Sequence, residues 1–360
     1  MKIAAALSGG VDSAVAAALL KEQGHELVGM TALVWPNSRC CDDRALHDAK
    51  LVADTLEIPY FTVDVMKEFR ESVVEDFINE YIAGRTPSPC PLCNRTVRFA
   101  VMWDKILGHL TDCEAIATGH YAIIEDLGKG RVALPPITPR WALRKGVDPN
   151  KDQSYMLYGL SQEQLSRTLT PLGTYTKEEV RKLAEKYNLP VSKKPDSQDA
   201  CFVDKDYKQF LSEQAAGRLP GDGDIVDAKG NVLGRHNGII NYTIGQRKGL
   251  NLAREGTDNQ PLYVTGIDAE KNMIIVGGKD QLYSAECIVC NINWIIPVPQ
   301  TTINITVRIR YNSREVPAEV SPLGDTRAKI FFKDPQPAVT PGQAAVFYNG
   351  DIVAGGGIIK

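Results

Sequence analysis

The chain has 360 residues, of which 43% are hydrophobic and 24% are charged, and its formal net charge is −3. This length exceeds one comfortable hydrophobic core, so we expect two or three domains with the composition of a soluble globular protein. The net charge gives no global attraction to nucleic acid, and no apolar run approaches the roughly 20 residues of a membrane span, so we expect no membrane partner.

The first predicted elements are an apolar strand at residues 3–7, a glycine-rich turn and a helix at residues 13–23. This order points backbone N–H groups and the positive end of a helix at an anion, most often phosphate. Gly9 and Gly10 allow the tight turn, Ser8 and Ser13 add hydroxyl donors, and Asp12 is placed to carry Mg²⁺. The P-loop NTPase and dinucleotide patterns are both absent. The alternative is an ordinary corner whose glycines serve only the turn.

Strand and helix then continue to alternate. Such alternation builds a parallel sheet with helices on both faces, and ligands bind at the carboxyl edge of its strands. At that edge, Gly119 and His120 close the last strand and are predicted to contact a nucleotide; the alternative is a structural turn and a satisfied polar group. The predicted strands are 26–34, 60–65 and 114–118, and the predicted helices are 44–56, 69–83 and 95–107.

Residues 84–94 contain prolines at positions 87, 89 and 91, which predict a stiff, non-helical loop. Cys93 would then lie just ahead of the helix at 95–107, where the dipole and free N–H groups stabilise a thiolate. Arg95 and Arg98 would lower the pKa of this thiol further. The pattern therefore predicts a reactive cysteine at position 93.

A zinc site is an alternative use of this loop, because Cys90 and Cys93 form half of a four-cysteine pattern. The other half would be Cys287 and Cys290. Their odd separation on a predicted strand sends the side chains to opposite faces, which disfavours this site.

The eight cysteines, several in adjacent or close pairs, are typical of reduced thiols in a cytoplasmic protein. Cys201 is predicted on a loop at a domain edge, and its pKa stays open because both acidic and basic residues precede it. Cys40 and Cys41 follow a loop near the nucleotide edge, and their role is left open.

Residues 129–151 contain six Lys or Arg against one acid, which makes a local phosphate-facing patch possible. The next residues combine Lys151 and Gln153 with Tyr155, a set that suits phosphate, base edge and base stacking in RNA. The alternative is a solvated loop with Asp152 as a helix N-cap.

Beyond residue 219 the sequence changes to short runs separated by turns. From about residue 262 on, short β-rich segments recur with a spacing that predicts a small antiparallel barrel. The fold class is therefore α/β, with a parallel-sheet domain at 1–205, a central β-rich domain at 206–270 and a β-barrel at 271–360. Arg308 and Arg310 alternate on one predicted strand and face the same side. The predicted strands are 262–267, 273–276, 303–310, 328–332, 344–348 and 352–358.

In this order, the segments resemble the tRNA-specific 2-thiouridylases from residue 3 to beyond 350. The resemblance rests on residues 6–13, 84–87, 92–94, 117–121, 151–153, 201–202 and 242–250. It implies an adenylating PP-loop domain of the adenine-nucleotide-hydrolase type, followed by a small central domain and a barrel. It also implies thiolation of the wobble uridine of certain tRNAs at C2. The reaction would use ATP, Mg²⁺ and a persulfide passed from a cysteine desulfurase or a sulfur relay protein.

The resemblance assigns roles residue by residue. Cys93 would be the nucleophile, Cys201 would receive the persulfide, and Asp12 would act at the pyrophosphate. ATP would be held by Ala6, Leu7, Ser8, Gly9, Gly10, Val11, Asp12, Ser13, Ala32 and Gly119. The tRNA would be met by Ser88, Pro89, Cys90, Lys151, Asp152, Gln153, Arg310 and Tyr311.

The chain departs from the family at one place, because Ser88, Pro89 and Cys90 stand where Asn-Pro-Asp is frequent. A thiol thus replaces a carboxylate, and Cys90, Cys93 and Cys201 form a set that could hold a [4Fe–4S] cluster. We favour the persulfide route, which needs two thiols and no metal. The rival functions are another PP-loop adenylating enzyme, such as a different tRNA thiolase or an amidotransferase-type synthetase, and a non-catalytic ATP-binding sensor.

Overall fold

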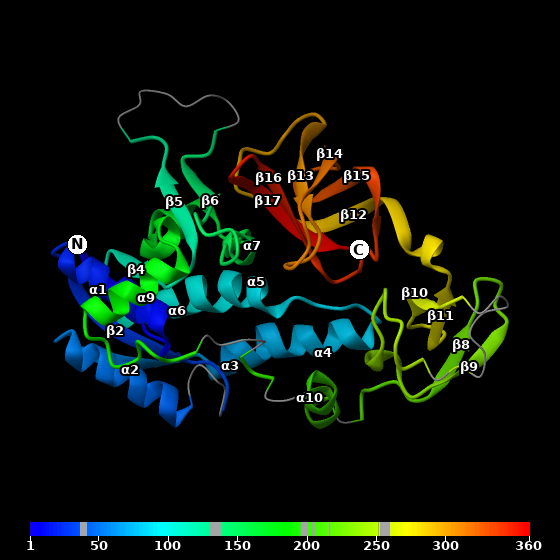
Figure 1. Cartoon of the computed structure of the whole chain (residues 1–360), viewed down its shortest axis with the longest axis horizontal. Coiled ribbons are helices and arrows are strands. Elements are labelled where there is room, and N and C mark those ends of the chain that lie inside the picture. Colours follow the sequence, from blue (N-terminus) through cyan, green and yellow to red (C-terminus); the bar gives the residue numbers. More distant parts are fainter. Residues whose placement is uncertain are drawn as a thin grey trace.

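The computed structural model describes residues 1–36, 42–129, 138–195, 201–203, 206–215, 217–250, 252 and 260–360. Within this part, the strands form a five-stranded, a four-stranded and an eight-stranded sheet. Figure 1 shows the first sheet with its helices on the left, the C-terminal strands of the eight-stranded sheet at the upper right and the four-stranded sheet at the far right. None of the described helices is long and apolar enough to cross a membrane.

The N-terminal sheet is parallel throughout and has the order β3-β2-β1-β4-β7. Alternate residues of its central strand feed two cores: Ala4 packs into one cluster, and Ile3 and Ala5 pack into the other. Helices cover both faces, which confirms the predicted α/β class. The strands are β1 (Lys2–Ala6), β2 (Glu26–Leu33), β3 (Tyr60–Asp64), β4 (Ala115–Ala117) and β7 (Thr168–Leu169).

One face of this sheet packs on apolar side chains of α1, α2 and α9, and the other packs on the helices between residues 66 and 109. The helices of this domain are α1 (Val11–Glu22), α2 (Asp43–Thr55), α3 (Met66–Phe69), α4 (Glu75–Ile82), α5 (Pro89–Cys93), α6 (Met102–His109), α7 (Ser154–Leu157), α8 (Gln162–Ser166) and α9 (Lys177–Lys186). Two π-helical stretches, η1 (Arg70–Val74) and η2 (Asn94–Val101), join α3 to α4 and α5 to α6.

The prediction of a non-helical loop up to residue 94 was wrong, because α5 begins at Pro89 and continues through η2 into α6. Pro89 and Pro91 fall within the first turn of this helix. The N–H groups of a first turn have no intrahelical acceptor, so a proline there removes no hydrogen bond. Cys93 therefore lies inside the helix, one turn from its start, and Cys90 occupies the first turn.

The C-terminal strands form a closed antiparallel barrel, because β12 pairs with both β15 and β17. The hairpin of β5 and β6, which belongs to the N-terminal half of the chain, extends this sheet beside β17, where Ile352 pairs with Arg144. The strands are β5 (Ala122–Asp126), β6 (Trp141–Lys145), β12 (Tyr283–Trp294), β13 (Ile303–Arg308), β14 (Val316–Pro322), β15 (Arg327–Pro337), β16 (Ala344–Asn349) and β17 (Ile352–Ile359).

Two strands expected in the barrel belong instead to the four-stranded sheet, whose order is β10-β11-β8-β9. The boundary expected at residue 270 falls between β10 and β11, which are paired with each other. The strands are β8 (Gly223–Val226), β9 (Val232–His236), β10 (Tyr263–Asp268) and β11 (Met273–Gly277). The helical segments that complete the chain are α10 (Tyr207–Gln214) and the 3₁₀ turns η3 (Pro171–Thr174), η4 (Ile239–Asn241) and η5 (Lys279–Leu282).

Candidate active site

A cavity of about 500 Å³ lies at the carboxyl edge of the parallel sheet, where β1, β2 and β4 end. Its size lies within the range of small-molecule sites. The predicted site residues that line it are Ala6, Leu7, Ser8, Gly10, Val11, Asp12, Ser13, Ala32, Pro89, Cys90, Cys93, Gly119, Lys151, Gln153, Cys201 and Tyr311. The fold therefore brings segments from the whole length of the chain to one cavity.

The conformation of the turn after β1, which lines this cavity, is stabilised by hydrogen bonds within the turn and the start of α1. The Ser13 hydroxyl accepts from the Ser8 N–H at 3.1 Å and donates to the Gly10 carbonyl at 3.1 Å. The N-cap of α1 is Gly10, which offers no capping side chain, so the first N–H groups of the helix stay available to an anion. The turn thus has the features of a phosphate-binding loop.

Two glycines are required by the geometry of this end. Gly9 has a φ of +67°, and a Cβ there would lie 2.4 Å from the Ala45 carbonyl oxygen, so Gly9 shapes the turn and does not line the cavity. A Cβ on Gly119 would lie 2.7 Å from the backbone of Asp12 and Ser13. The loop after β4 can therefore touch the start of α1 only because residue 119 has no side chain.

Asp12 is oriented by two donors from distant segments. Its Oδ1 accepts from the Tyr121 hydroxyl at 2.8 Å and from Lys177 Nζ at 2.7 Å. A second lysine, Lys194, donates to the Gly9 carbonyl at 2.9 Å and to Asp48 at 2.7 Å. Neither lysine was predicted from the sequence, since nothing in their spacing connects them to the first loop.

The three thiols differ in exposure although all line the cavity. Cys90 is exposed, Cys201 is partly buried and Cys93 is buried. Cys90 and Cys93 are three residues apart in α5 and so lie on the same side of the helix. Although Cys90 has exposed surface, the many protein atoms around its thiol desolvate it and raise its pKa, and the charge of Arg98 opposes this rise. Because α5 begins at Pro89, the thiol in its first turn belongs to Cys90 and not to Cys93.

His120 is held neutral. Its Nδ1 lies 2.8 Å from the Thr118 hydroxyl, and burial together with the charge of Arg98 lowers its pKa to about 3. Because Nδ1 is engaged with Thr118, the neutral imidazole offers a ligand in the cavity one nitrogen, Nε2, which donates or accepts according to the tautomer.

The residues predicted to meet RNA fall into two groups. The cavity is lined by Pro89, Cys90, Lys151, Gln153 and Tyr311, whereas Ser88, Asp152 and Arg310 are absent from its walls. Asp152 is 7% exposed and accepts from the Gly146 and Ser154 N–H groups. The Arg310 guanidinium donates to the carbonyls of residues 244 and 338 and to the hydroxyl of residue 340, and burial lowers its pKa.

The basic stretch at 129–151 is largely neutralised where the structure describes it. Arg140 pairs with Asp126, Arg144 pairs with Glu125 and Asp351, and Lys145 pairs with Glu315. Residue 131, another cation of this stretch, lies outside the described residues, as do Cys40 and Cys41. Among the described residues, the expected phosphate-facing patch is therefore reduced to the exposed Lys129 and to Lys151 at the cavity wall.

Comparison with known proteins gives three domain matches in chain order. Residues 1–205 match the tRNA methyl transferase HUP domain, 208–278 the tRNA methyl transferase PRC-barrel domain and 284–359 the aminomethyltransferase β-barrel domain. The tRNA-specific 2-thiouridylase MnmA of Geotalea uraniireducens is 47% identical over 371 residues, which cover 100% of this chain and 95% of that protein. The chain belongs to the tRNA-specific 2-thiouridylase family.

Another member of this family, MnmA 1 of Caldanaerobacter subterraneus, is 46% identical and is covered over 98% of its length. Among solved structures, the U34-tRNA thiolase NcsA from Methanococcus maripaludis with its [4Fe-4S] cluster is 19% identical. That match covers 59% of this chain and 63% of NcsA, with a TM-score of 0.32.

Proposed function

We propose that the protein is a tRNA-uridine 2-sulfurtransferase that activates O2 of the wobble uridine with ATP and replaces it with sulfur. The observation that carries this proposal is the single cavity in which a phosphate-binding loop and three thiols face the same space. A nucleotide-binding sensor has no need of the thiols, and an amidotransferase-type synthetase has no need of a thiol pair.

The first step answers a chemical difficulty. The C2 carbonyl of a pyrimidine is a poor electrophile, so its oxygen must become a leaving group before sulfur can replace it. Attack of O2 on the α-phosphate of ATP, with release of the N3 proton to water, forms the adenylated uridine and releases pyrophosphate. The base regains this proton when 2-thiouridine is released. The N–H groups at the start of α1, the hydroxyl of Ser8, and Lys177 and Lys194 supply donors and positive charge where the pyrophosphate would form.

Mg²⁺ fits this end of the cavity. In phosphoryl-transfer sites this ion is held by one or two carboxylates together with substrate phosphates, and Asp12 supplies one oriented carboxylate. Bound there, Mg²⁺ would neutralise charge on the phosphates. Tyr121 and Lys177 hold the Asp12 side chain in place for this role.

The second step uses two cysteines. The terminal sulfur of a persulfide on Cys201 attacks C2, and AMP departs with the former O2, which leaves the uridine joined to Cys201 through a disulfide. The Cys93 thiolate then attacks Cys201 Sγ, releases 2-thiouridine and forms a Cys93–Cys201 disulfide. An external dithiol returns both cysteines to thiols.

The [4Fe–4S] alternative at Cys90, Cys93 and Cys201 is less well supported by their placement. Among the described residues, no three His, Cys, Asp or Glu side chains are grouped so that they could hold a metal ion. The three thiols share a cavity without converging on one point, so we derive no step through a cluster.

The proposed partners are tRNA and a sulfur-donor protein, and the proposed location is the cytoplasm. The route described above needs Cys93 and Cys201 as thiols at its start, and the cytoplasm keeps thiols reduced. No disulfide joins the cysteines that the structure describes. Cys201 adjoins residues 196–200, which lie outside the described part, so the approach of a donor to this thiol stays a proposal.

The test is formation of 2-thiouridine in unmodified tRNA with ATP, Mg²⁺ and a cysteine desulfurase that supplies persulfide, measured by mass spectrometry of digested tRNA. We expect product and pyrophosphate in equal amounts. Pyrophosphate release and product formation that survive the double substitution Cys93→Ser and Cys201→Ser would favour another adenylating enzyme. ATP binding without pyrophosphate release in the presence of tRNA would favour a sensor.

A further inference from the structure

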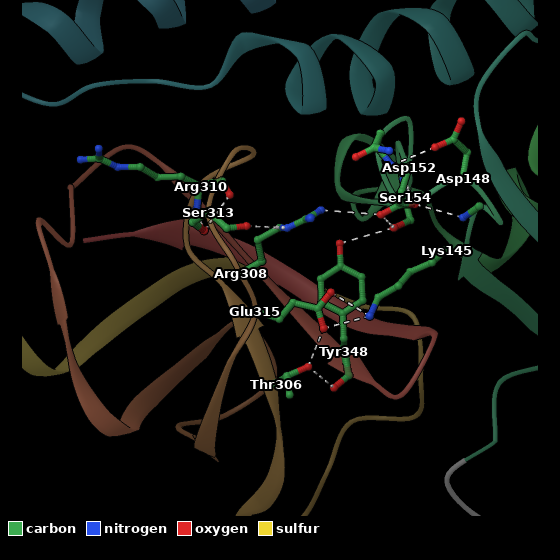
Figure 2. A network of polar contacts seen from close by, with 12 residues as sticks. Lys145, Asp148, Asp152, Ser154, Thr306, Arg308, Arg310, Ser313, Glu315 and Tyr348 are labelled. Atoms are coloured by element: carbon green, nitrogen blue, oxygen red, sulfur yellow. Dashed lines mark hydrogen bonds and ion pairs between the residues drawn. The ribbon is translucent and has the colours of Figure 1, made fainter. Parts of the chain in front are cut away.

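A partly buried ion pair joins the barrel to the cavity loop. Figure 2 shows Arg308 of β13 reaching across to Asp152, which lies between the cavity-lining residues Lys151 and Gln153. Arg308 Nη1 lies 3.6 Å from Asp152 Oδ2, and the two side chains are 18% and 6% exposed. Removing Arg308 from this pair leaves the buried Asp152 carboxylate without its counterion.

Asp152 also organises its own loop. Its Oδ1 accepts from the Gly146 N–H at 3.1 Å and the Ser154 N–H at 3.0 Å, and its Oδ2 accepts from the Ser154 hydroxyl at 3.0 Å. Ser154 in turn lies 3.4 Å from the hydroxyl of Tyr348 on β16 (Figure 2). The loop is therefore fixed from inside by Asp152 and from outside by the barrel.

From this loop the contacts continue to the phosphate end. The backbone of Gln153 donates to the Tyr121 carbonyl at 2.8 Å, and the Gln153 side chain accepts from the Tyr121 N–H at 3.0 Å. The Tyr121 hydroxyl donates to Asp12 Oδ1 at 2.8 Å. A continuous series of contacts thus leads from Arg308 through Asp152, Gln153 and Tyr121 to Asp12.

Arg308 also fixes the barrel side of the cavity. Its Nε donates to the Ser313 carbonyl at 3.1 Å, and the Ser313 hydroxyl accepts from the Arg310 N–H at 3.1 Å. These bonds close the turn that contains Tyr311, a cavity residue. The Arg308 guanidinium therefore contacts both walls of the cavity through different nitrogens, Nη1 toward Asp152 and Nε toward Ser313. The single nitrogen of an ammonium group cannot reproduce this geometry.

We propose that Arg308 is a positioning residue through which the barrel sets the cavity walls for adenylation. This inference rests on the proposed function. Arg308 and Asp152 do not line the cavity, so they act through Gln153, Tyr121 and Tyr311, which do. The predicted contact of Asp152 with tRNA stays a prediction, and the present proposal gives this side chain a role in holding the loop.

The chain offers a matched control. Arg144 of β6 pairs with Asp351 at 2.8 Å and so also joins the hairpin to the barrel, but neither residue lines the cavity. We would compare Arg308→Met, Arg308→Lys and Arg144→Met in pyrophosphate release with saturating tRNA, and record kcat and the KM for ATP with the melting temperature of each.

We expect Arg308→Met to lower kcat about tenfold, because small misplacements of reacting groups are costly, and Arg144→Met to stay within about twofold. Arg308→Lys should fall between, because it keeps the charge and loses one contact. Equal effects of Arg308→Met and Arg144→Met, or an unchanged kcat in Arg308→Met, would overturn the proposal.

Two further measurements distinguish a positioning role from a phosphate contact and from a loss of folding. The salt dependence of tRNA binding should be unchanged in Arg308→Met; a slope reduced by about one unit would show a phosphate contact and overturn the positioning role. If Arg308→Met does not fold, Asp152→Asn removes the same pair with little change in shape and must give the same loss of kcat. A wild-type protein that releases no pyrophosphate would count against the proposed function itself.

Discussion

At the phosphate end of the cavity, residues 6–13 supply a turn, a helix start and a carboxylate from one short stretch of chain, whereas at the thiol end Cys90, Cys201 and Tyr311 are each more than 100 residues apart. The first end is built by local backbone geometry. The second is assembled by contacts between the parallel-sheet domain and the barrel. The phosphate end should therefore be sensitive to changes in the backbone, and the thiol end to the identity and placement of single side chains.

The largest effect is expected at the thiol end. Cys93→Ala and Cys201→Ala should each lower 2-thiouridine formation by at least about a thousandfold, since each removes a sulfur that forms a covalent bond in the reaction. Cys90→Asp, which restores the carboxylate common in the family, should remain active. Cys290→Ala on β12 is the control and should leave activity unchanged, because that residue lies outside the cavity walls.

Mass spectrometry of digested tRNA measures these effects. An active Cys201→Ala protein would contradict both the persulfide route and the cluster alternative. An inactive Cys90→Asp protein would show that the thiol at position 90 is itself required, and would contradict a mechanism that uses only two cysteines.

The next effect is expected at the phosphate end. Asp12→Ala should lower pyrophosphate release about a hundredfold, because it removes the oriented carboxylate proposed to hold Mg²⁺. The melting temperature should change little, since Asp12 is partly exposed at the cavity surface. Asp48→Ala, which loses the partner of Lys194 without touching the cavity, is the comparison. Normal pyrophosphate release by Asp12→Ala would exclude this role.

A backbone test of the same end is Gly119→Ala. The new Cβ would meet the backbone of Asp12 and Ser13 at 2.7 Å, so the start of α1 must move away from the β4 loop. We expect the KM for ATP to rise about tenfold. Gly108→Ala in α6 is the matched control, because a Cβ there meets no atom within 4 Å. That change should raise stability by up to about 1 kcal/mol, as alanine is the better helix former. An unchanged KM in Gly119→Ala would show that the close approach is dispensable.

The smallest effects are expected for Lys151 and Arg310, which the sequence analysis both predicts to contact tRNA. Lys151→Ala should lower the slope of log Kd for tRNA against log salt by about one unit, as for one lost phosphate contact. Arg310→Ala should leave the slope unchanged and lower stability by about 1 kcal/mol, because its guanidinium is engaged with backbone carbonyls. Fluorescence anisotropy at several salt concentrations and thermal unfolding measure the two quantities. A reduced salt slope in Arg310→Ala would show that Arg310 does contact a tRNA phosphate.

Much of the fold could be predicted from the pattern of the chain. The alternating apolar runs indicated the parallel sheet, and the strands at 303–310, 328–332, 344–348 and 352–358 correspond to β13, β15, β16 and β17. Two barrel strands, β12 and β14, were missed. β14 carries Pro317 and Pro322, and β12 is partly exposed along much of its length, so neither shows a clear apolar run.

Prolines also misled at the thiol end. Three of them near Cys93 predicted a loop, whereas Pro89 and Pro91 begin a helix. Local composition does not distinguish a proline in a loop from one in the first turn of a helix, because neither position needs a backbone N–H to donate a hydrogen bond.

By itself, the sequence determined the phosphate loop, the parallel sheet and the cysteines at issue, since each depends on neighbours within a few residues. Only the tertiary structure decided that Lys177 and Tyr121 orient Asp12 and that Arg308 pairs with Asp152. It also decided that the Arg310 guanidinium donates to backbone carbonyls. These pairs are separated by more than 25 residues, and their polar side chains follow no periodicity. The choice of partner for a charged side chain depends on which atoms the packed domains bring within hydrogen-bond distance, and that information is absent from local sequence.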